Sequence, residues 1–214
     1  AQSPSVPSIN ALHEYADKNG VSPKDYIFKL FEKSDIVVLG ERDHRDSIQY
    51  NFILDLLADS RFAERVGHVY TEVGGINLTE DVNRLLNATY ATEGNFMDSL
   101  YTYYRKGKCF YPLWEKYNRI KFLKGLYNIN KKTSRKIHLG LTDINFSWDS
   151  IHTVDDYKAF WKSLNKTNRD SLLCANFASM YEHQPIVKGA RKALVITSQP
   201  HAISYSGYFK PWNR

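Results

Sequence analysis

The sequence has little cysteine and no long apolar run. Two cysteines, Cys109 and Cys174, occur among 214 residues, and their wide separation excludes a zinc knuckle. Pairing and two free thiols both fit this count, so cysteine content leaves the redox compartment open. No stretch approaches the roughly 20 apolar residues of a membrane helix, so no membrane span is expected. No internal repeat is visible either.

Several signature motifs are also absent. The sequence contains no Gly-x-Ser-x-Gly, no Gly-x-x-x-x-Gly-Lys-Ser/Thr, no Gly-x-Gly-x-x-Gly and no His-Glu-x-x-His. These absences argue against a serine nucleophile elbow, a nucleotide cofactor and a zincin-type metal helix. The net charge of +6 is spread over the chain, without a motif that reads DNA or RNA. We therefore expect a small-molecule substrate and no nucleic-acid partner, with no indication of oligomeric state.

The length suits one domain with an elaborated lid. Residues 1–8 are polar, proline-rich and lack an initiator Met, which predicts a disordered lead-in and an exported protein cleaved after its signal, or a trimmed chain. Residues 9–214 are expected to form one α/β domain. No closing helix is evident after residue 204, so the natural chain is expected to continue past Arg214 or to lack a stretch.

Four short apolar runs, each followed by residues that can do chemistry, are the most informative feature. Their richness in β-branched residues predicts buried parallel strands, hence a mostly parallel sheet flanked by helices. Ligands bind at the carboxyl ends of such strands, so the polar residues should gather at one edge. The runs and the residues that follow are 35–40 with Glu41 and His44, 66–71 with Glu72, 136–142 with Asp143, and 192–198 with His201.

Apolar spacing predicts helices before the first of these strands and between them. Ser22 is expected to cap one of them, and Tyr117 to lie on the apolar face of the longest. The aromatic-rich segment 90–111 shows no clean period and leaves two interpretations open: a satellite cluster packed over the core, or a lid lining a ligand cleft. The predicted helices are 12–18, 23–33, 47–58, 79–86, 112–130, 154–164 and 169–183.

The Glu41–His44 spacing favours acid–base chemistry. Three residues apart, the carboxylate can hold one imidazole nitrogen and leave the other as a base toward water. The alternative is a capped helix start with an exposed histidine. Glu72 needs a partner or a function if it is buried. Ser198 is a weak nucleophile candidate, and a divalent metal held by these carboxylates and histidines is the second interpretation.

A family resemblance rests on six ordered segments. The chain resembles the erythromycin-esterase-like proteins, within the wider group that includes the ChaN-like haem-associated lipoproteins, from residue 35 onward. The segments that carry it are DIVVLGERDH (35–44), VYTEVGG (69–75), WEKYNRIKFLKGLYNIN (114–130), LGLTD (139–143), NRDSLLCANF (168–177) and ALVITSQPHAI (193–203).

The resemblance implies an ester hydrolase whose histidine base activates water. Carried over, Glu41, His44, Glu72 and His201 are the predicted catalytic residues. Asp143, Ser198 and Arg169 are the predicted substrate-binding residues, and Asp170 and Asn176 also match the family's late helix. Two features depart from the family: Ser198 stands where its first late histidine would be, and Arg42, Asp43 and Arg45 replace small residues in the first loop.

No metal or other cofactor is expected for this hydrolase. Two alternatives remain open: a haem- or metal-binding protein of the ChaN-like type, with a divalent metal or haem as cofactor, and a non-catalytic member of the fold.

Overall fold

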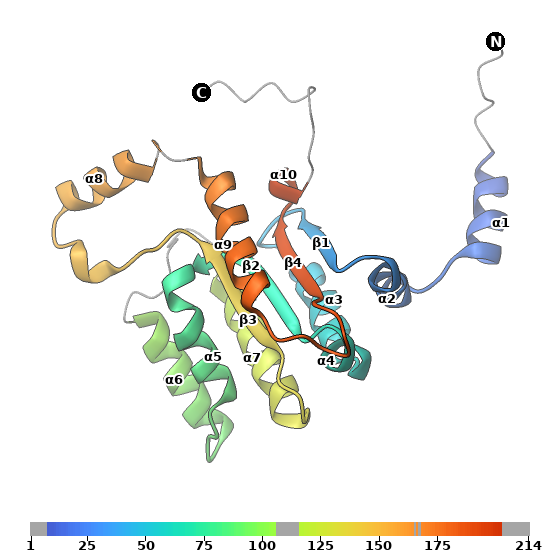
Figure 1. Cartoon of the computed structure of the whole chain (residues 1–214), viewed down its shortest axis with the longest axis horizontal. Coiled ribbons are helices and arrows are strands. Elements are labelled where there is room, and N and C mark those ends of the chain that lie inside the picture. The colour runs from blue at the N-terminus through green and yellow to red at the C-terminus, as the bar shows by residue number, and fades with distance from the viewer. Residues whose placement is uncertain (1–7, 106–115, 165, 167, 203–214) are drawn as a thin grey trace, which may run out of the picture.

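The computed structural model describes residues 8–105, 116–164, 166 and 168–202. Its centre is a sheet of four parallel strands in the order β1-β4-β2-β3, flanked by helices (Figure 1). The predicted fold class is confirmed. The strands are β1 (Ile36–Glu41), β2 (His68–Gly75), β3 (His138–Asp143) and β4 (Ala193–Ser198).

The register brings the strand ends to one edge of the sheet. Glu41, the last residue of β1, pairs with Ser198, the last residue of β4. Asp143, the last residue of β3, pairs with Gly75 of β2. The predicted end of β2 at Glu72 is wrong by three residues, because the strand continues through a register shift between Thr71 and Gly75. The irregularity leaves Glu72 at the same edge as the other strand ends.

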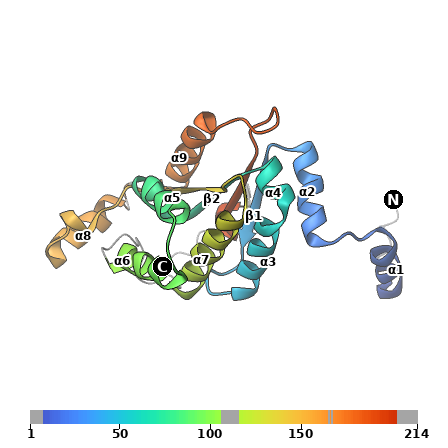
Figure 2. The ribbon, with the colours of Figure 1, turned by 90° about the horizontal axis from the view of Figure 1, so that it is seen from below.

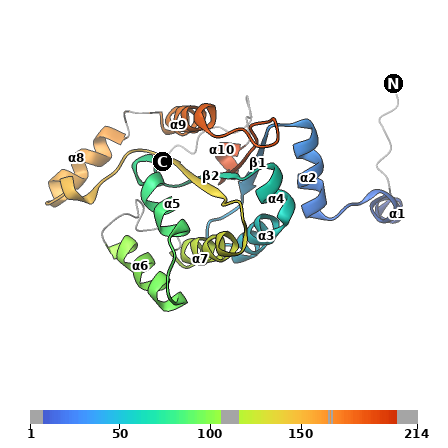
Figure 3. The same ribbon diagram turned by 60° about the horizontal axis from the view of Figure 1, so that its bottom comes forward.

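Helices cover the two faces of the sheet unequally. Figures 2 and 3 show α9 on one face and α3, α4 and α7 on the other. The predicted bounds of α2, α3, α8 and α9 are confirmed, and Ser22 caps α2 by accepting from the backbone N–H of Asp25. The helices are α1 (Ile9–Asn19), α2 (Pro23–Lys33), α3 (Ser47–Ala58), α4 (Ser60–Arg65), α5 (Thr79–Asn87), α6 (Glu93–Arg105), α7 (Lys116–Lys132), α8 (Val154–Leu164), α9 (Arg169–His183) and α10 (Gln199–Ala202), with 3-10 turns η1 (Ile76–Leu78) and η2 (Trp148–Ser150).

The free edge of β3 is closed by side chains of α5. Asn83 donates to the carbonyl of Leu139 and accepts from its N–H, while Thr79 Oγ1 accepts from the N–H of Leu141. An edge strand with unpaired backbone groups is exposed to pairing with other chains. These buried contacts satisfy that edge and fix α5 against the sheet.

The aromatic-rich segment is largely a helix, which the sequence pattern did not predict. Phe96 and Leu100 of α6 are fully buried, and the ring of Phe96 stacks on Tyr127 of α7 with centroids 3.9 Å apart. Tyr90 meets both rings edge-on. Most of the aromatic side chains in the described part of this segment pack on the core, as the satellite-cluster interpretation expects, whereas Tyr101 is 45% exposed. Phe110 and the rest of 106–111 lie outside the described residues.

Two helices lie away from the sheet. No residue of α1 is buried, and it projects from the body beside α2 (Figure 1). The helix α8 likewise has no buried residue, and its Phe160 packs with Phe146 and Trp148 in a small separate cluster. No helix within the described ranges is long and apolar enough to cross a membrane. The predictions for residues 1–7 and for the tail after 204 lie outside the described residues.

Candidate functional site

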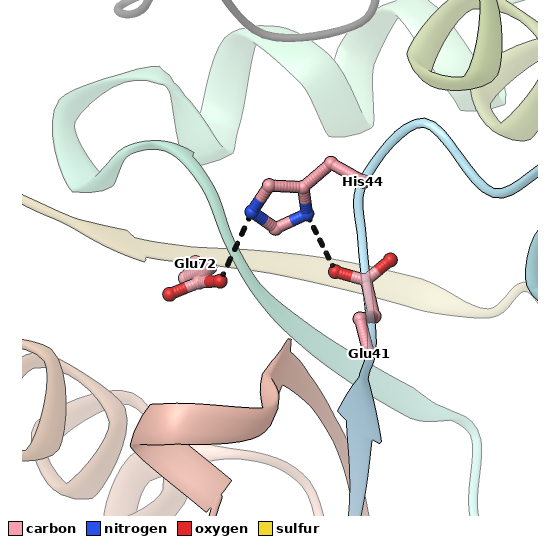
Figure 4. A group of neighbouring side chains, drawn as sticks. All are labelled: Glu41, His44 and Glu72. Carbon is pink, nitrogen blue, oxygen red and sulfur yellow. Dashed lines mark hydrogen bonds and ion pairs between the residues drawn. The ribbon is translucent and has the colours of Figure 1, made fainter.

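A tight turn after β1 brings His44 back onto Glu41. The backbone N–H of Asp46 donates to the carbonyl of Asp43, and the Asp46 side chain then caps α3. This turn places Nδ1 of His44 2.9 Å from Oε2 of Glu41 (Figure 4). The sequence prediction that these two residues meet across three positions is confirmed. The cap of α3 is also present, but it is made by Asp46, and His44 is turned inward.

His44 bridges two buried carboxylates. Its Nε2 lies 3.4 Å from Oε1 of Glu72, so one imidazole faces a carboxylate at each nitrogen (Figure 4). The side chains of Glu41 and Glu72 are each 2% exposed, and that of His44 is 19% exposed. The hydrogen bond to Glu41, followed by that to Glu72, raises the pKa of His44 to about 9 against the opposing effect of burial. At neutral pH this imidazole is protonated.

Glu72 connects His44 to the end of β4 and to His201. Its Oε1 accepts a hydrogen bond of 2.7 Å from the backbone N–H of Ser198, and its Oε2 lies 3.5 Å from Nε2 of His201. Burial alone would raise the pKa of Glu72. The hydrogen bonds from His44 and from Ser198, together with the charge of His201, instead lower it to about 2. Ser198 therefore meets Glu72 through its backbone.

His201 is held from the other side by α9. It lies on the short helix α10, and its Nδ1 is 2.6 Å from Oδ1 of Asp170. Asp170 is mostly exposed, whereas Glu72 is buried. The prediction that His44, Glu72 and His201 converge is confirmed, because Glu72 contacts both imidazoles. A continuous chain of carboxylates and imidazoles thus runs from solvent at Asp170 to the interior at Glu41.

Asp143 and Arg169 form an ion pair. Asp143 is fully buried and takes two hydrogen bonds from the Arg169 guanidinium, at 3.0 and 2.9 Å. Its Oδ1 also accepts from the N–H of Ile144. Asn176 of α9 donates to the carbonyl of Thr142, next to Asp143. The pair fastens α9 to the end of β3, so these two predicted substrate-binding residues occupy a positioning role in this structure.

Three further neighbours of the site were missed at the sequence level. Asn118 of α7 donates to the carbonyl of His44 at 2.9 Å and fixes the turn from below. Burial, followed by the charge of Glu41, raises the pKa of Tyr50 on α3. Arg119 is 8% exposed and lies over the ring of Phe122. Polar residues on the buried face of a helix are a signal that could have indicated Asn118 and Arg119. The predicted buried face of α7 was wrong, however, because Tyr117, which was placed on it, is 66% exposed.

The cluster has the geometry of a cation site as well as of an acid–base site. One ligand atom from each of Glu41, His44 and Glu72 lies within 4.8 Å of the other two, the one such group among the described residues. Oε1 of Glu41 and Oε2 of Glu72 are buried and accept no hydrogen bond from the residues described. Carboxylate and imidazole ligands suit several divalent metals.

Comparison with family models, with curated proteins and with solved structures finds no match to this chain.

Proposed function

We propose that the protein is a hydrolase that attacks ester-type bonds with water activated by His44. The observation that carries the proposal is the short contact between Glu41 and Nδ1 of His44, whose ring lies between the carboxylates of Glu41 and Glu72. A carboxylate that accepts from one imidazole nitrogen fixes the ring and directs the other nitrogen at the reacting atom. In this arrangement the reacting nitrogen is Nε2, on the side of Glu72.

The two contacts of His44 differ in length, and the difference supports these roles. The Glu41 contact is 2.9 Å, whereas Nε2 is 3.4 Å from Glu72. A longer contact is easier to open for a water molecule, and catalytic hydrogen bonds are commonly long before substrate binds. Since the pKa of His44 is about 9, the neutral base is scarce at pH 7. Hydrolysis should therefore rise with pH until His44 loses its proton.

Glu72 and His201 position the reaction in this proposal. Glu72 stays ionised because its pKa is about 2, and it can hold a water close to Nε2 of His44. His201 can donate from Nε2 toward the substrate oxygen while Asp170 accepts at Nδ1. A hydrogen-bond donor aimed at developing negative charge lowers the barrier of acyl transfer.

The ester class comes from the resemblance to the erythromycin-esterase-like proteins. Glu41, His44, Glu72 and His201 match the family's first loop, second strand and late histidine. Ser198 replaces the other late histidine, and its backbone N–H makes the contact to Glu72. We infer that one imidazole, His201, serves where the family has two.

A second candidate function is the binding of a divalent cation by Glu41, His44 and Glu72. The observation that favours it is the buried oxygen on each carboxylate that accepts no hydrogen bond from the described residues. A cation there would displace the proton from His44, because a metal ligand must be a neutral imidazole.

The two candidates are separated by hydrolysis of p-nitrophenyl acetate with and without EDTA. His44→Gln should reduce kcat by roughly 10²–10⁴-fold, the usual contribution of a general base. His152→Gln is the matched control, because His152 is exposed and lies far along the chain, just before α8. Activity that survives His44→Gln contradicts the base. Activity lost on chelation and restored by a divalent metal supports the cation site instead.

A further inference from the structure

An apolar groove lies between α9 and the open part of the sheet. Its volume is about 200 Å³. Side chains of β1 and β4 form one wall, α9 forms the other, and α10 closes the end nearest the site (Figure 3 shows α9 above the sheet with α10 beside it). The side chains that argue for its character are Ile36, Val38, Val195, Leu173, Phe177 and Cys174.

The groove exists because α9 covers only half of this face. Phe177 packs edge-on against Tyr70 of β2, with ring centroids 4.9 Å apart, and so directs α9 toward β2 and β3. On β1, Val37 points into the core, whereas Ile36 and Val38 on the opposite face are 39% and 47% exposed. Apolar side chains left open beside a polar site are typical of ligand pockets.

The groove adjoins the proposed catalytic cluster at His201. His201 and Asp170 line its end, and the same His201 lies 3.5 Å from Glu72. A molecule held at His201 can therefore place an adjoining apolar group in the groove. The three carboxylates of the cluster, Glu41, Glu72 and Asp170, outnumber its two imidazoles, so the cluster opposes an anionic group despite the overall positive charge of the chain.

We infer that this groove binds the acyl group of an uncharged ester, and that this acyl group is an apolar chain of medium length or an apolar ring. The inference rests on the proposed hydrolase function and names its substrate class. A dry cavity of about 150 Å³ accommodates benzene, so about 200 Å³ suits an acyl chain of similar size. The free thiol of Cys174 reports on the groove, because it is exposed and lies in the wall.

The first test compares p-nitrophenyl acetate, the hexanoate and the anionic glutarate half-ester. Hexanoate has four more CH₂ groups than acetate, and burial of about half of their surface in the open groove should raise kcat/KM by on the order of tenfold. The glutarate half-ester should fall below both. Cys174→Trp, which fills the groove, should remove the preference for hexanoate over acetate. Ala175→Trp is the matched control, because Ala175 is exposed on the same helix and is not among the residues that line the groove.

The second test does not need activity. In a Cys109→Ser background, the rate of Cys174 alkylation by iodoacetamide is measured with hexanamide or acetamide present. Slower alkylation with hexanamide alone supports the groove. Equal rates with both amides overturn it, and so does protection that depends only on protein concentration, which would assign the face to a second copy of the chain.

The two tests separate the two proposals. If no ester is hydrolysed but hexanamide protects Cys174, the hydrolase proposal fails and the apolar ligand site stands. If esters are hydrolysed and Cys174→Trp leaves the hexanoate preference unchanged, the groove inference fails and the hydrolase proposal stands.

Discussion

The pKa of His44 is the property of this site that is most directly open to measurement. We predict that Glu41→Gln lowers it well below about 9, because the hydrogen bond to Glu41 is the largest cause of the rise. The amide still fits the space of the carboxylate but carries no charge. The contact of 3.4 Å with Glu72 remains, so the pKa should settle between 6.5 and about 9.

The magnitude follows from the two pKa values. A tenfold change in proton affinity corresponds to about 1.4 kcal/mol, so a rise from 6.5 to about 9 stabilises the imidazolium by about 3 kcal/mol. The pKa of His44 is higher in the folded state than in the unfolded state. Its contribution to the free energy of unfolding is therefore complete below pH 6.5 and is lost as the pH rises through about 9.

The assay is an NMR titration of the His44 ring proton, assigned with His44→Gln, in the wild type and in Glu41→Gln. Urea unfolding at pH 6 and pH 9.5 gives the matching change in stability. If catalysis needs neutral His44, the rising limb of the pH–rate profile should move to lower pH in Glu41→Gln while the plateau falls. A wild-type pKa of His44 near 6.5, or one that Glu41→Gln leaves unchanged, would refute the reasoning.

Three further outcomes are expected. Arg169→Gln should lower the free energy of unfolding by about 3–5 kcal/mol, because it strands the fully buried carboxylate of Asp143; urea titration measures this. Glu72→Gln should make the stability of the fold less sensitive to acid. The pKa of Glu72 is about 2 in the folded state, so its contribution to the free energy of unfolding is complete above pH 4.5 and disappears as the pH falls through about 2. Acid unfolding followed by circular dichroism measures the difference. Gly140→Ala should cost about 1–3 kcal/mol in the same urea assay, because its Cβ would lie 2.3 Å from the ring of Tyr70.

Matched controls sharpen these measurements. Lys158→Gln removes an exposed ion pair with Asp155 and should cost less than about 1 kcal/mol, in contrast to Arg169→Gln. Gly94→Ala should be neutral or stabilising, since its nearest neighbour would be 3.5 Å away within a helix. An Arg169→Gln variant as stable as Lys158→Gln would contradict the buried-pair argument. Equal effects of the two glycine substitutions would contradict the close packing of Tyr70.

Several helix limits could be predicted because their signals are local. Ser22 followed by Pro23 defines the start of α2, and apolar residues at helical spacing locate α3. Where the local signal was weak, the prediction was poorer. The helix α6 escaped notice because its burial depends on Phe96 stacking against Tyr127, an interaction across 31 positions. The prediction that Tyr117 lies on the buried face of its helix was wrong, because an aromatic residue type alone does not indicate whether the side chain faces the core or solvent.

The sequence by itself determined the strand-then-polar order, and with it the edge at which Glu41, Glu72 and Asp143 meet, because parallel strands place their carboxyl ends together. It also determined that Glu41 and His44 can touch, since a three-residue separation is a local constraint. Only the tertiary structure decided what each carboxylate contacts. Glu72 contacts His44, which lies 28 residues before it, and His201, which lies 129 residues after it. Asp143 instead forms an ion pair with Arg169. Such pairings depend on strand order and on where α9 packs, and no local pattern encodes either.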